Sequence, residues 1–312
     1  MDGVNKRFRS CMSTAREPEG PPRTLALKSG LYSPGDKTLD DWHDILYVQN
    51  ARIYQPVLEA GLSSAPSEAR GLAEIFSRFN LRAKAGRRPK ILDVACGIGR
   101  HSINLAKLGY EVVGFDFSPY FLKTARRLAR QEGLKQRSVL RFYQGDTAQI
   151  KEILHVNRET NFDAIICMDT STVRPTLSEE VELLRSLHEV GRKGSLLVIE
   201  TANRESFLKY KRYLTLPLVQ SFPGGLQRHI QASYDPRSQH IKGDWKFFRE
   251  LPSGNLKCLL SIKMESYIHS RSDLRAVLEK VGWKYLRCYG SVKRLDRLDS
   301  DSYHIVMVVK KA

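Results

Sequence analysis

The feature that most constrains this chain is an alternation of short apolar segments with longer amphipathic segments, which begins at Lys90. Apolar runs of strand length occupy residues 91–95, 111–115, 140–143, 164–168 and 196–200. Helical periodicity occupies residues 101–108, 119–131 and 179–190 between them. Strand–helix alternation of this length requires right-handed crossovers between parallel strands. The sequence therefore predicts an α/β fold with a doubly wound, mostly parallel sheet.

The flanking segments predict further elements. Residues 38–80 have helical periodicity, with a second helix over 67–79. Turn sequences separate three antiparallel strands predicted over residues 229–234, 241–249 and 256–267. A helix over residues 273–281 ends at Gly282, and two closing strands follow over 283–289 and 303–309. With these two strands the predicted sheet has seven strands.

We predict five segments from this pattern. They are a disordered basic arm (1–36), an N-terminal helical cap (37–87), a Rossmann-like core (88–203), an inserted antiparallel lid or substrate lobe (204–268) and the C-terminal part of the core sheet (269–312).

A strand, a glycine turn and a helix follow one another in Ile91-Leu-Asp-Val-Ala-Cys-Gly-Ile-Gly-Arg-His101. Gly97 and Gly99 allow the backbone to approach a ligand closely and to adopt dihedrals that other residues avoid. The exposed amides at the start of the helix favour an anionic group. Asp116 ends the next strand, nineteen residues after Gly97, where an acid is placed to accept hydrogen bonds from ribose hydroxyls. The segment therefore predicts a nucleotide-binding site.

The ordered set of Asp93, the Ala-Cys-Gly-Ile-Gly turn, Asp116 and Gly145-Asp146 resembles the class I, Rossmann-like S-adenosylmethionine-dependent methyltransferases. Within that class, the turn and the later Gly114-Phe-Asp-Phe-Ser-Pro run resemble the branch with many small-molecule enzymes. The resemblance covers roughly residues 88–203 and the closing strands, and it implies S-adenosylmethionine as cofactor. Ala95 replaces a glycine that is common in the family's turn.

The resemblance also implies roles for individual residues. The turn would face the methionyl part of the donor, Asp116 would bind the ribose, Phe117 would lie beside the adenine, and Asp146 would accept from the adenine amino group. The expected cofactor-binding residues are Asp93, Ala95, Cys96, Gly97, Gly99, Asp116, Phe117, Asp146, Thr147 and Met168. Two alternatives stay open from the residues themselves: Asp146 caps the turn that follows it, and Cys96 is a packed small residue.

The acceptor pocket is expected over the carboxyl ends of the fourth and fifth strands, where ligands bind in open α/β sheets. The sequence there, Cys167-Met-Asp-Thr-Ser171, lacks the Asn/Asp-Pro-Pro-Tyr motif of many amino-methylating enzymes of DNA and of some RNA and protein targets. It also lacks the Pro-Cys pair used in cytosine C5 methylation. Candidates for substrate contact are Asp169, His229, Tyr234 and His269. Glu200 ends the fifth strand and is expected to orient the loop after it. No general base is assigned.

Composition bounds the remaining hypotheses. Five scattered cysteines without a C-x-x-C pair argue against a disulfide framework and against a zinc site. We therefore expect no metal, and we expect a cytoplasmic location. No apolar run approaches the length of a membrane span. The leading hypothesis is methylation of a small molecule. The alternative is an RNA methyltransferase, because the net charge is +17. Aminopropyl transfer is disfavoured. Enzymes of that family typically carry Asp-x-x-Asp after the fourth strand, and the segment Asp169-Thr-Ser-Thr lacks the second acid.

Overall fold

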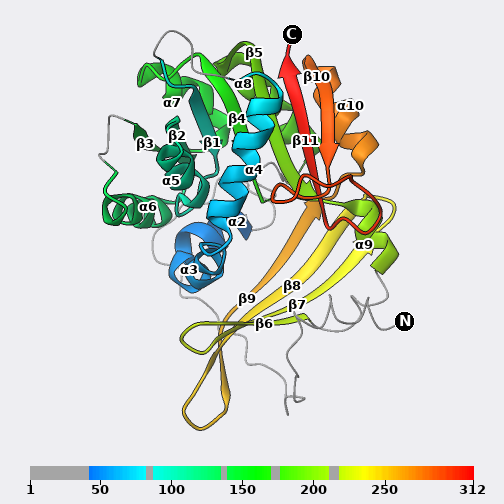
Figure 1. The fold of residues 1–312 in the computed structure, drawn as a ribbon. Helices are drawn as coiled ribbons and strands as arrows, with labels where there is room; N and C mark the ends of the chain where they lie inside the picture. The colour runs from blue at the N-terminus through cyan, green and yellow to red at the C-terminus, as the bar shows by residue number, and fades with distance from the viewer. Residues whose placement is uncertain (1–41, 82–86, 135–138, 170–175, 211–217) are drawn as a thin grey trace. The chain divides into compact units, whose positions relative to one another are not determined.

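The computed structural model describes residues 42–81, 87–134, 139–169, 176–210 and 218–312 (Figure 1). The predicted arm, residues 1–36, lies outside the described residues. The chain divides into two compact units, one formed by residues 1–57 and 211–265 and the other by residues 58–210 and 266–312.

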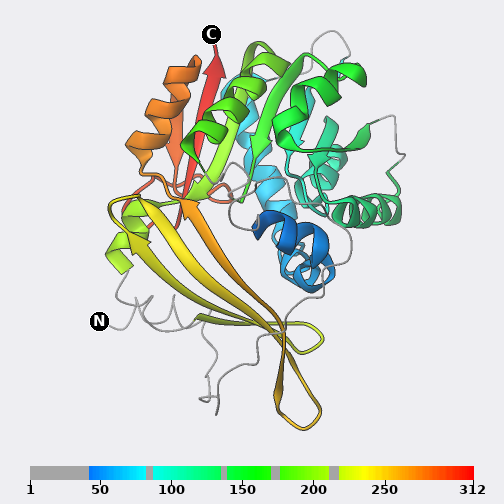
Figure 2. The same ribbon diagram turned by 180° about the vertical axis from the view of Figure 1, so that it is seen from behind.

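The second unit is built on a mostly parallel sheet. In the described part of the chain this sheet has seven strands in the order β10-β11-β5-β4-β1-β2-β3 (Figures 1 and 2). The strands are β1 (Lys90–Val94), β2 (Glu111–Asp116), β3 (Leu140–Gln144), β4 (Phe162–Cys167), β5 (Gly191–Ala202), β10 (Trp283–Tyr289) and β11 (His304–Lys311). Strands β1 to β5 are parallel, and β11 is antiparallel to both β5 and β10. The predicted fold class is therefore confirmed.

Helices cover both faces of this sheet, as expected of a doubly wound fold (Figures 1 and 2). They are α4 (Ala65–Arg78), α5 (Arg100–Lys107), α6 (Pro119–Gln131), α7 (Ile150–Val156), α8 (Leu177–Val190) and α10 (Arg271–Val281). A further helix, α9 (Arg204–Tyr210), follows the end of β5. Alternate residues of the central strands enter two buried clusters: Ile91 joins the one with α4, α5 and α6, and Leu92 joins the one with α7, α8 and α10. The near-continuous apolar strands of the sequence follow from this double burial.

Helix α4 belongs to the unit that contains the parallel sheet, whereas the sequence analysis grouped it with a separate helical cap. Its buried side chains Leu72, Ile75 and Phe76 pack in the same cluster as the strands. The segment boundaries proposed from the sequence stay predictions.

Four described elements are not among the predicted ones: α7, α9, β6 and the 3-10 helix η2 (Thr147–Gln149). Helix α7 has seven residues and buries only Ile150 and Leu154, so its periodicity is too short to stand out. Strand β5 begins at Gly191, five residues earlier than predicted, because its first residues include polar ones. Helix α10 begins where Ser270 and Asp273 form a capping box, and Gly282 ends it in the left-handed conformation.

The first unit contains an antiparallel sheet, as predicted, but with a fourth strand. The order is β6 (Leu218–Phe222), β7 (Leu226–Asp235), β8 (His240–Glu250) and β9 (Leu256–Tyr267). The described N-terminal part is α2 (Trp42–Asp44), the π-helix η1 (Ile45–Gln49) and the start of α3 (Ala51–Ala60). Tyr54 stacks on Trp245 of β8, with ring centroids 6.4 Å apart, and the Arg228 guanidinium lies 4.5 Å from the Trp245 ring. Among the described residues, no helix combines the length and apolar character that a membrane span needs.

Candidate functional site

The glycine turn between β1 and α5 is held in left-handed backbone conformations. Ala95, Gly97 and Gly99 have φ values of +52°, +55° and +78°. A Cβ atom added to Gly99 would lie 3.0 Å from Phe142 and 3.1 Å from Ala125, so the turn also needs a small residue to pack there. At Gly97 the nearest atom would be 3.6 Å away, so the requirement for glycine there comes from φ.

Asp116 joins this turn to the end of β2. Its Oδ2 accepts the backbone N–H of Gly97 at 2.7 Å, and its Oδ1 accepts the backbone N–H of Ser118 at 2.9 Å. The residue is 4% exposed. Burial raises the pKa of the Asp116 carboxyl to about 6, and the backbone N–H donors oppose that rise. The structure thus places the acid of β2 beside the glycine turn, where the sequence predicted a ribose acceptor.

Asp93 lies at the base of the same turn. Its Oδ2 accepts the Ser102 hydroxyl of α5 at 2.5 Å, and burial raises the pKa of the carboxyl. Cys96 is buried, and burial raises the pKa of its thiol well above the ordinary value, which fits a packed residue rather than a nucleophile.

After β3, Asp146 caps the turn that follows it, which was one of the two interpretations left open from the sequence. Asp146 is exposed, and its Oδ1 accepts the Ala148 backbone N–H at 2.9 Å as the N-cap of the short helix Thr147–Gln149. Phe117 follows β2 and is half-buried, and Met168 follows β4 and is buried. Their expected contacts with a donor, and those of Asp146 and Thr147, stay predictions.

A network of charged side chains lies next to the glycine turn. Glu68 of α4 is 7% exposed and pairs with Arg100, with His101 Nε2 at 3.0 Å and with Lys293 Nζ at 3.2 Å. Arg100 also pairs with Asp169 after β4. Although burial opposes ionisation, the hydrogen bond with His101 and the charge of Arg100 hold the pKa of Glu68 far below its usual value. Glu68 is therefore ionised, with Arg100 and Lys293 beside it, and Arg100 joins Glu68 to Asp169.

Glu200, near the end of β5, lies in a different electrostatic environment. Its side chain is buried, and His304 Nδ1 of β11 lies 4.0 Å from its Oε1. Burial, together with the negative charges of Asp169 and Glu68, raises the pKa of the Glu200 carboxyl to about 8. Burial also lowers the pKa of His304. Glu200 is therefore a carboxyl group that changes its protonation state near neutral pH, at the carboxyl edge of a parallel sheet.

The structure separates the four acceptor candidates named from the sequence. Asp169 joins the charged network, in a left-handed conformation with φ +54°. His269 is buried, and its Nε2 lies 2.8 Å from Glu180 of α8, which gives it a structural partner. His229 and Tyr234 lie on β7 of the other unit, where His229 packs on Phe248 with ring centroids 4.6 Å apart.

The sequence patterns did not indicate the charged groups Glu68, Glu200 and His304 at the carboxyl edge of the sheet as functional residues. Glu200 gave a signal, because an acid that ends an apolar parallel strand faces the ligand-binding edge, but it was assigned only an orienting role. Glu68 and His304 gave none, since they are far from the glycine turn in sequence. No group of three or more potential metal ligands occurs among the described residues.

Comparison with known proteins adds the family context. A family described as "Methyltransferase domain" matches residues 87–242, which is half of the 312-residue chain. The glycine/sarcosine N-methyltransferase of Parasynechococcus marenigrum is 33% identical over 149 residues, 47% of this chain and 48% of that protein. The ubiquinone biosynthesis O-methyltransferase of Xanthomonas axonopodis pv. citri is 29% identical over 115 residues, 37% of this chain and 44% of that protein.

A short match has a different character. The 23S rRNA (uracil(1939)-C(5))-methyltransferase RlmD of Shewanella sp. (strain ANA-3) is 47% identical over 57 residues, which are 18% of this chain and 12% of that protein. The chain spans about half the length or less of the curated relatives it matches.

One solved structure similar in fold is an S-adenosylmethionine-dependent methyltransferase from Clostridium acetobutylicum. Its TM-score is 0.66 at 16% identity, with 85% of this chain and 98% of that chain covered. The CcbJ methyltransferase from Streptomyces caelestis has a TM-score of 0.62 at 17% identity, with 80% and 89% covered.

Proposed function

This chain belongs to the methyltransferase domain family, and we propose that it transfers a methyl group from S-adenosylmethionine to a small molecule. The atom that receives the methyl group is a nitrogen or an oxygen that loses a proton. The observation that carries the donor half of this proposal is the Asp116 carboxylate, which ties the Gly97 amide to the end of β2. The donor and acceptor halves rest on different residues and are argued separately.

The residues at the turn fit an adenosyl group. Each carboxylate oxygen of Asp116 accepts one backbone N–H and keeps acceptor capacity for a hydroxyl donor. Asp116 would hold the ribose, and the turn from Ala95 to Gly99 would bring the backbone close to the rest of the donor. When bound, S-adenosylmethionine supplies an already activated methyl group, so the protein contributes chiefly proximity and alignment.

Glu200 supports the acceptor half. A hydroxyl group must lose its proton to become a neutral ether on methylation, and an ammonium group must lose one to free the lone pair that attacks the methyl group. A carboxyl group with a pKa near 8, at the carboxyl ends of β4 and β5, is suited to take that proton. Arg100 and Asp169 would set the electrostatic environment, since Arg100 favours the ionised form of Glu200 and Asp169 opposes it.

The relatives support a small-molecule acceptor. The cyanobacterial relative is by its name an N-methyltransferase of glycine and sarcosine, and the Xanthomonas relative an O-methyltransferase of ubiquinone biosynthesis. The short match to the ribosomal RNA enzyme and the net charge of +17 support the RNA alternative. The small-molecule assignment is favoured because the first two matches extend over more of the chain.

The donor half is tested with S-adenosylhomocysteine by isothermal titration calorimetry. We expect saturable binding in the micromolar range, about −8 kcal/mol, and a loss of about tenfold or more in Asp116→Asn. The matched control is Asp163→Asn, because Asp163 is also a buried aspartate of the sheet but pairs with Arg87 and Arg192 and lies at the start of β4. Equal affinity in wild type and Asp116→Asn would overturn the assignment.

A further inference from the structure

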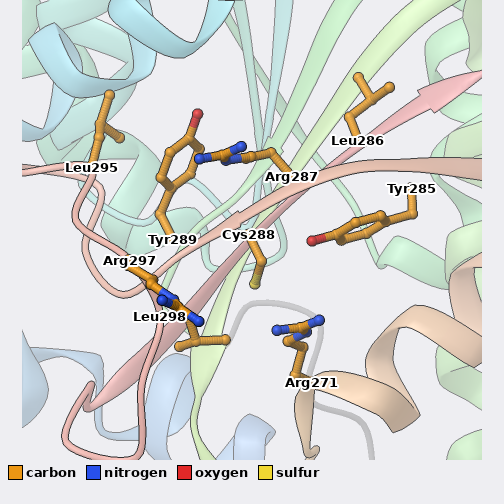
Figure 3. A pocket seen from close by; sticks show the side chains of 9 residues that line it. All are labelled: Arg271, Tyr285, Leu286, Arg287, Cys288, Tyr289, Leu295, Arg297 and Leu298. Carbon is orange, nitrogen blue, oxygen red and sulfur yellow. The ribbon is translucent and has the colours of Figure 1, made fainter.

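A cavity of about 350 Å³ lies at the free edge of the seven-stranded sheet, away from the glycine turn (Figure 3). Its nine lining residues are Arg271, Tyr285, Leu286, Arg287, Cys288, Tyr289, Leu295, Arg297 and Leu298. Strands β11, β5 and β4 separate β10 from β1, which at the usual strand spacing is about 19 Å. The cavity is therefore distinct from the proposed donor site.

Two backbone irregularities form this cavity. A β-bulge between Tyr285 and Arg287 interrupts the alternation of side chains at this edge strand. The lining residues come from both faces of the strand: Leu286 and Tyr289 pack with the cluster of Ile91, and Tyr285 and Cys288 pack with the cluster of Leu92. The chain after β10 then folds back, so that Arg297 forms a β-bridge with Tyr289 and Gly290 donates its N–H to Asp296 O at 3.0 Å. Leu295 has a φ of +52° in this returning loop, a conformation uncommon for leucine.

The lining carries three guanidinium groups and no carboxylate. Figure 3 shows the guanidinium groups of Arg271 and Arg297 on two sides of the Cys288 side chain, and that of Arg287 beside the Tyr289 ring. Burial raises the pKa of the Cys288 thiol to about 11, and the charge of Arg271 opposes that rise, so this guanidinium acts on the cavity interior. The neutral thiol does not offset the charges of Arg271, Arg287 and Arg297, whose side chains are exposed.

Arginines just outside the lining are paired, unlike those inside it. Arg275 is 2.8 Å from Glu279, and Arg294 is 2.8 Å from Asp296. Within the described part of the chain, Arg271, Arg287 and Arg297 form no ion pair with a carboxylate, and Arg287 lies 6.0 Å from the Tyr289 ring. Arg271 is moreover the first residue of α10, where the positive end of the helix dipole disfavours a cation. Each of these features makes a bound anion favourable.

We propose that this cavity binds the phosphate monoester group of a small organic molecule. Guanidinium groups match phosphate oxygens with paired hydrogen bonds, and three of them suit a dianion better than a monoanionic carboxylate. The volume falls in the range of small-molecule sites, roughly 300–1,000 Å³, and exceeds what a bare phosphate fills. Tyr285 and Leu298, which pack with the same core cluster, give the organic part of such a ligand an apolar surface.

The experiment uses phenyl phosphate, inorganic phosphate and benzyl alcohol as probes, titrated into the full chain by calorimetry at constant ionic strength. We expect saturable millimolar or tighter binding of phenyl phosphate, at least about tenfold weaker binding of inorganic phosphate, and none of benzyl alcohol. Equal affinity for inorganic phosphate would overturn the organic-ligand assignment. Absence of saturable phenyl phosphate binding to the folded chain would overturn the site itself.

Variants separate a specific site from the attraction of a basic surface. Arg287→Gln and Arg297→Gln should each lower phenyl phosphate affinity by about tenfold, while Arg294→Gln, in the same loop but paired with Asp296, should stay within about twofold of wild type. An equal loss in Arg294→Gln would show general electrostatic attraction and overturn the proposal. Thermal melting of each variant establishes that it is folded.

A readout in the wild-type chain does not depend on any variant. Iodoacetamide is uncharged, and its reaction with Cys288, followed by peptide mass spectrometry, should slow when phenyl phosphate is bound. Cys258, on β9 of the other unit, serves as the internal control, and its rate should not change. Unchanged alkylation of Cys288 at saturating phenyl phosphate would overturn this location.

Discussion

The backbone N–H of Gly97 donates to Asp116 Oδ2 at 2.7 Å, so the glycine turn after β1 and the acid at the end of β2 form one unit. Asp116 is buried, and its carboxyl has a pKa of about 6, because the cost of burying its charge exceeds the gain from its backbone N–H donors. The turn is consequently held by an acid whose charge state changes in an accessible pH range.

This relationship predicts a pH dependence of donor binding. Below a pH of about 6 the Asp116 carboxyl becomes protonated and loses acceptor capacity, so S-adenosylhomocysteine affinity should fall as the pH is lowered from about 7.5 to about 5. Calorimetry over that range measures the effect. Asp116→Asn should bind weakly at every pH and lack this dependence. A wild-type affinity that does not change over the range would show that Asp116 does not contact the donor.

Glu200 predicts a pH dependence of stability. Its folded-state pKa of about 8 lies above the ordinary value of 4.5, so the native state binds more protons and stability declines as pH rises between those values. Glu200→Gln, which stays neutral, should therefore gain in melting temperature relative to wild type as the pH increases. Glu182→Gln, at an exposed carboxylate of α8, is the control and should show no such trend. A constant difference between Glu200→Gln and wild type would contradict the raised pKa.

Gly99 predicts a local packing requirement. In Gly99→Ala the new methyl group would lie 3.0 Å from Phe142, and the alanine would have to keep a backbone φ of +78°. The free energy of unfolding should therefore fall by about 2 kcal/mol or more. Gly133→Ala is a matched control, because φ there is +69° but a Cβ would meet nothing within 4 Å. Urea titration of both variants separates the steric part from the backbone part. Equal destabilisation of the two would mean that the packing of the turn against Phe142 is unimportant.

The acceptor class predicts where a labelled methyl group is transferred. With methyl-labelled S-adenosylmethionine, we expect label in the small-molecule fraction of a cell extract and not in total RNA. Lys123, Arg127 and Arg130 form an exposed basic stripe on α6, and changing all three to Gln should leave that transfer unchanged. Label in RNA that decreases with salt, and is lost in this triple variant, would instead establish the RNA alternative.

Two basic residues, one just before β1 and one at its start, are paired within the fold, which weakens the argument for RNA from the net charge of +17. Arg87 is 2.8 Å from Asp163, and Lys90 is 2.7 Å from Glu159. Residues 82–86 lie outside the described part of the chain.

The sequence by itself determined the parallel sheet and the glycine turn, because both depend on local patterns. A few consecutive residues are enough to recognise an apolar run that is buried on two faces. The same holds for a turn glycine such as Gly97 and for an acid at the end of a strand such as Asp116. The capping of α10 by Ser270 and its end at Gly282 are local in the same sense. Helix α7 was missed because seven residues give too little periodicity.

Only the tertiary structure decided which charged groups meet. Glu68 and His101 are 33 positions apart yet their side chains lie 3.0 Å from each other, and Glu200 faces His304 across two strands that are distant in sequence. It also gave His269 a buried partner in Glu180, which no local pattern indicates. A pKa depends on burial and on the sum of nearby charges, and both arise only when the strands and helices pack, so the raised pKa of Glu200 has no signature along the chain.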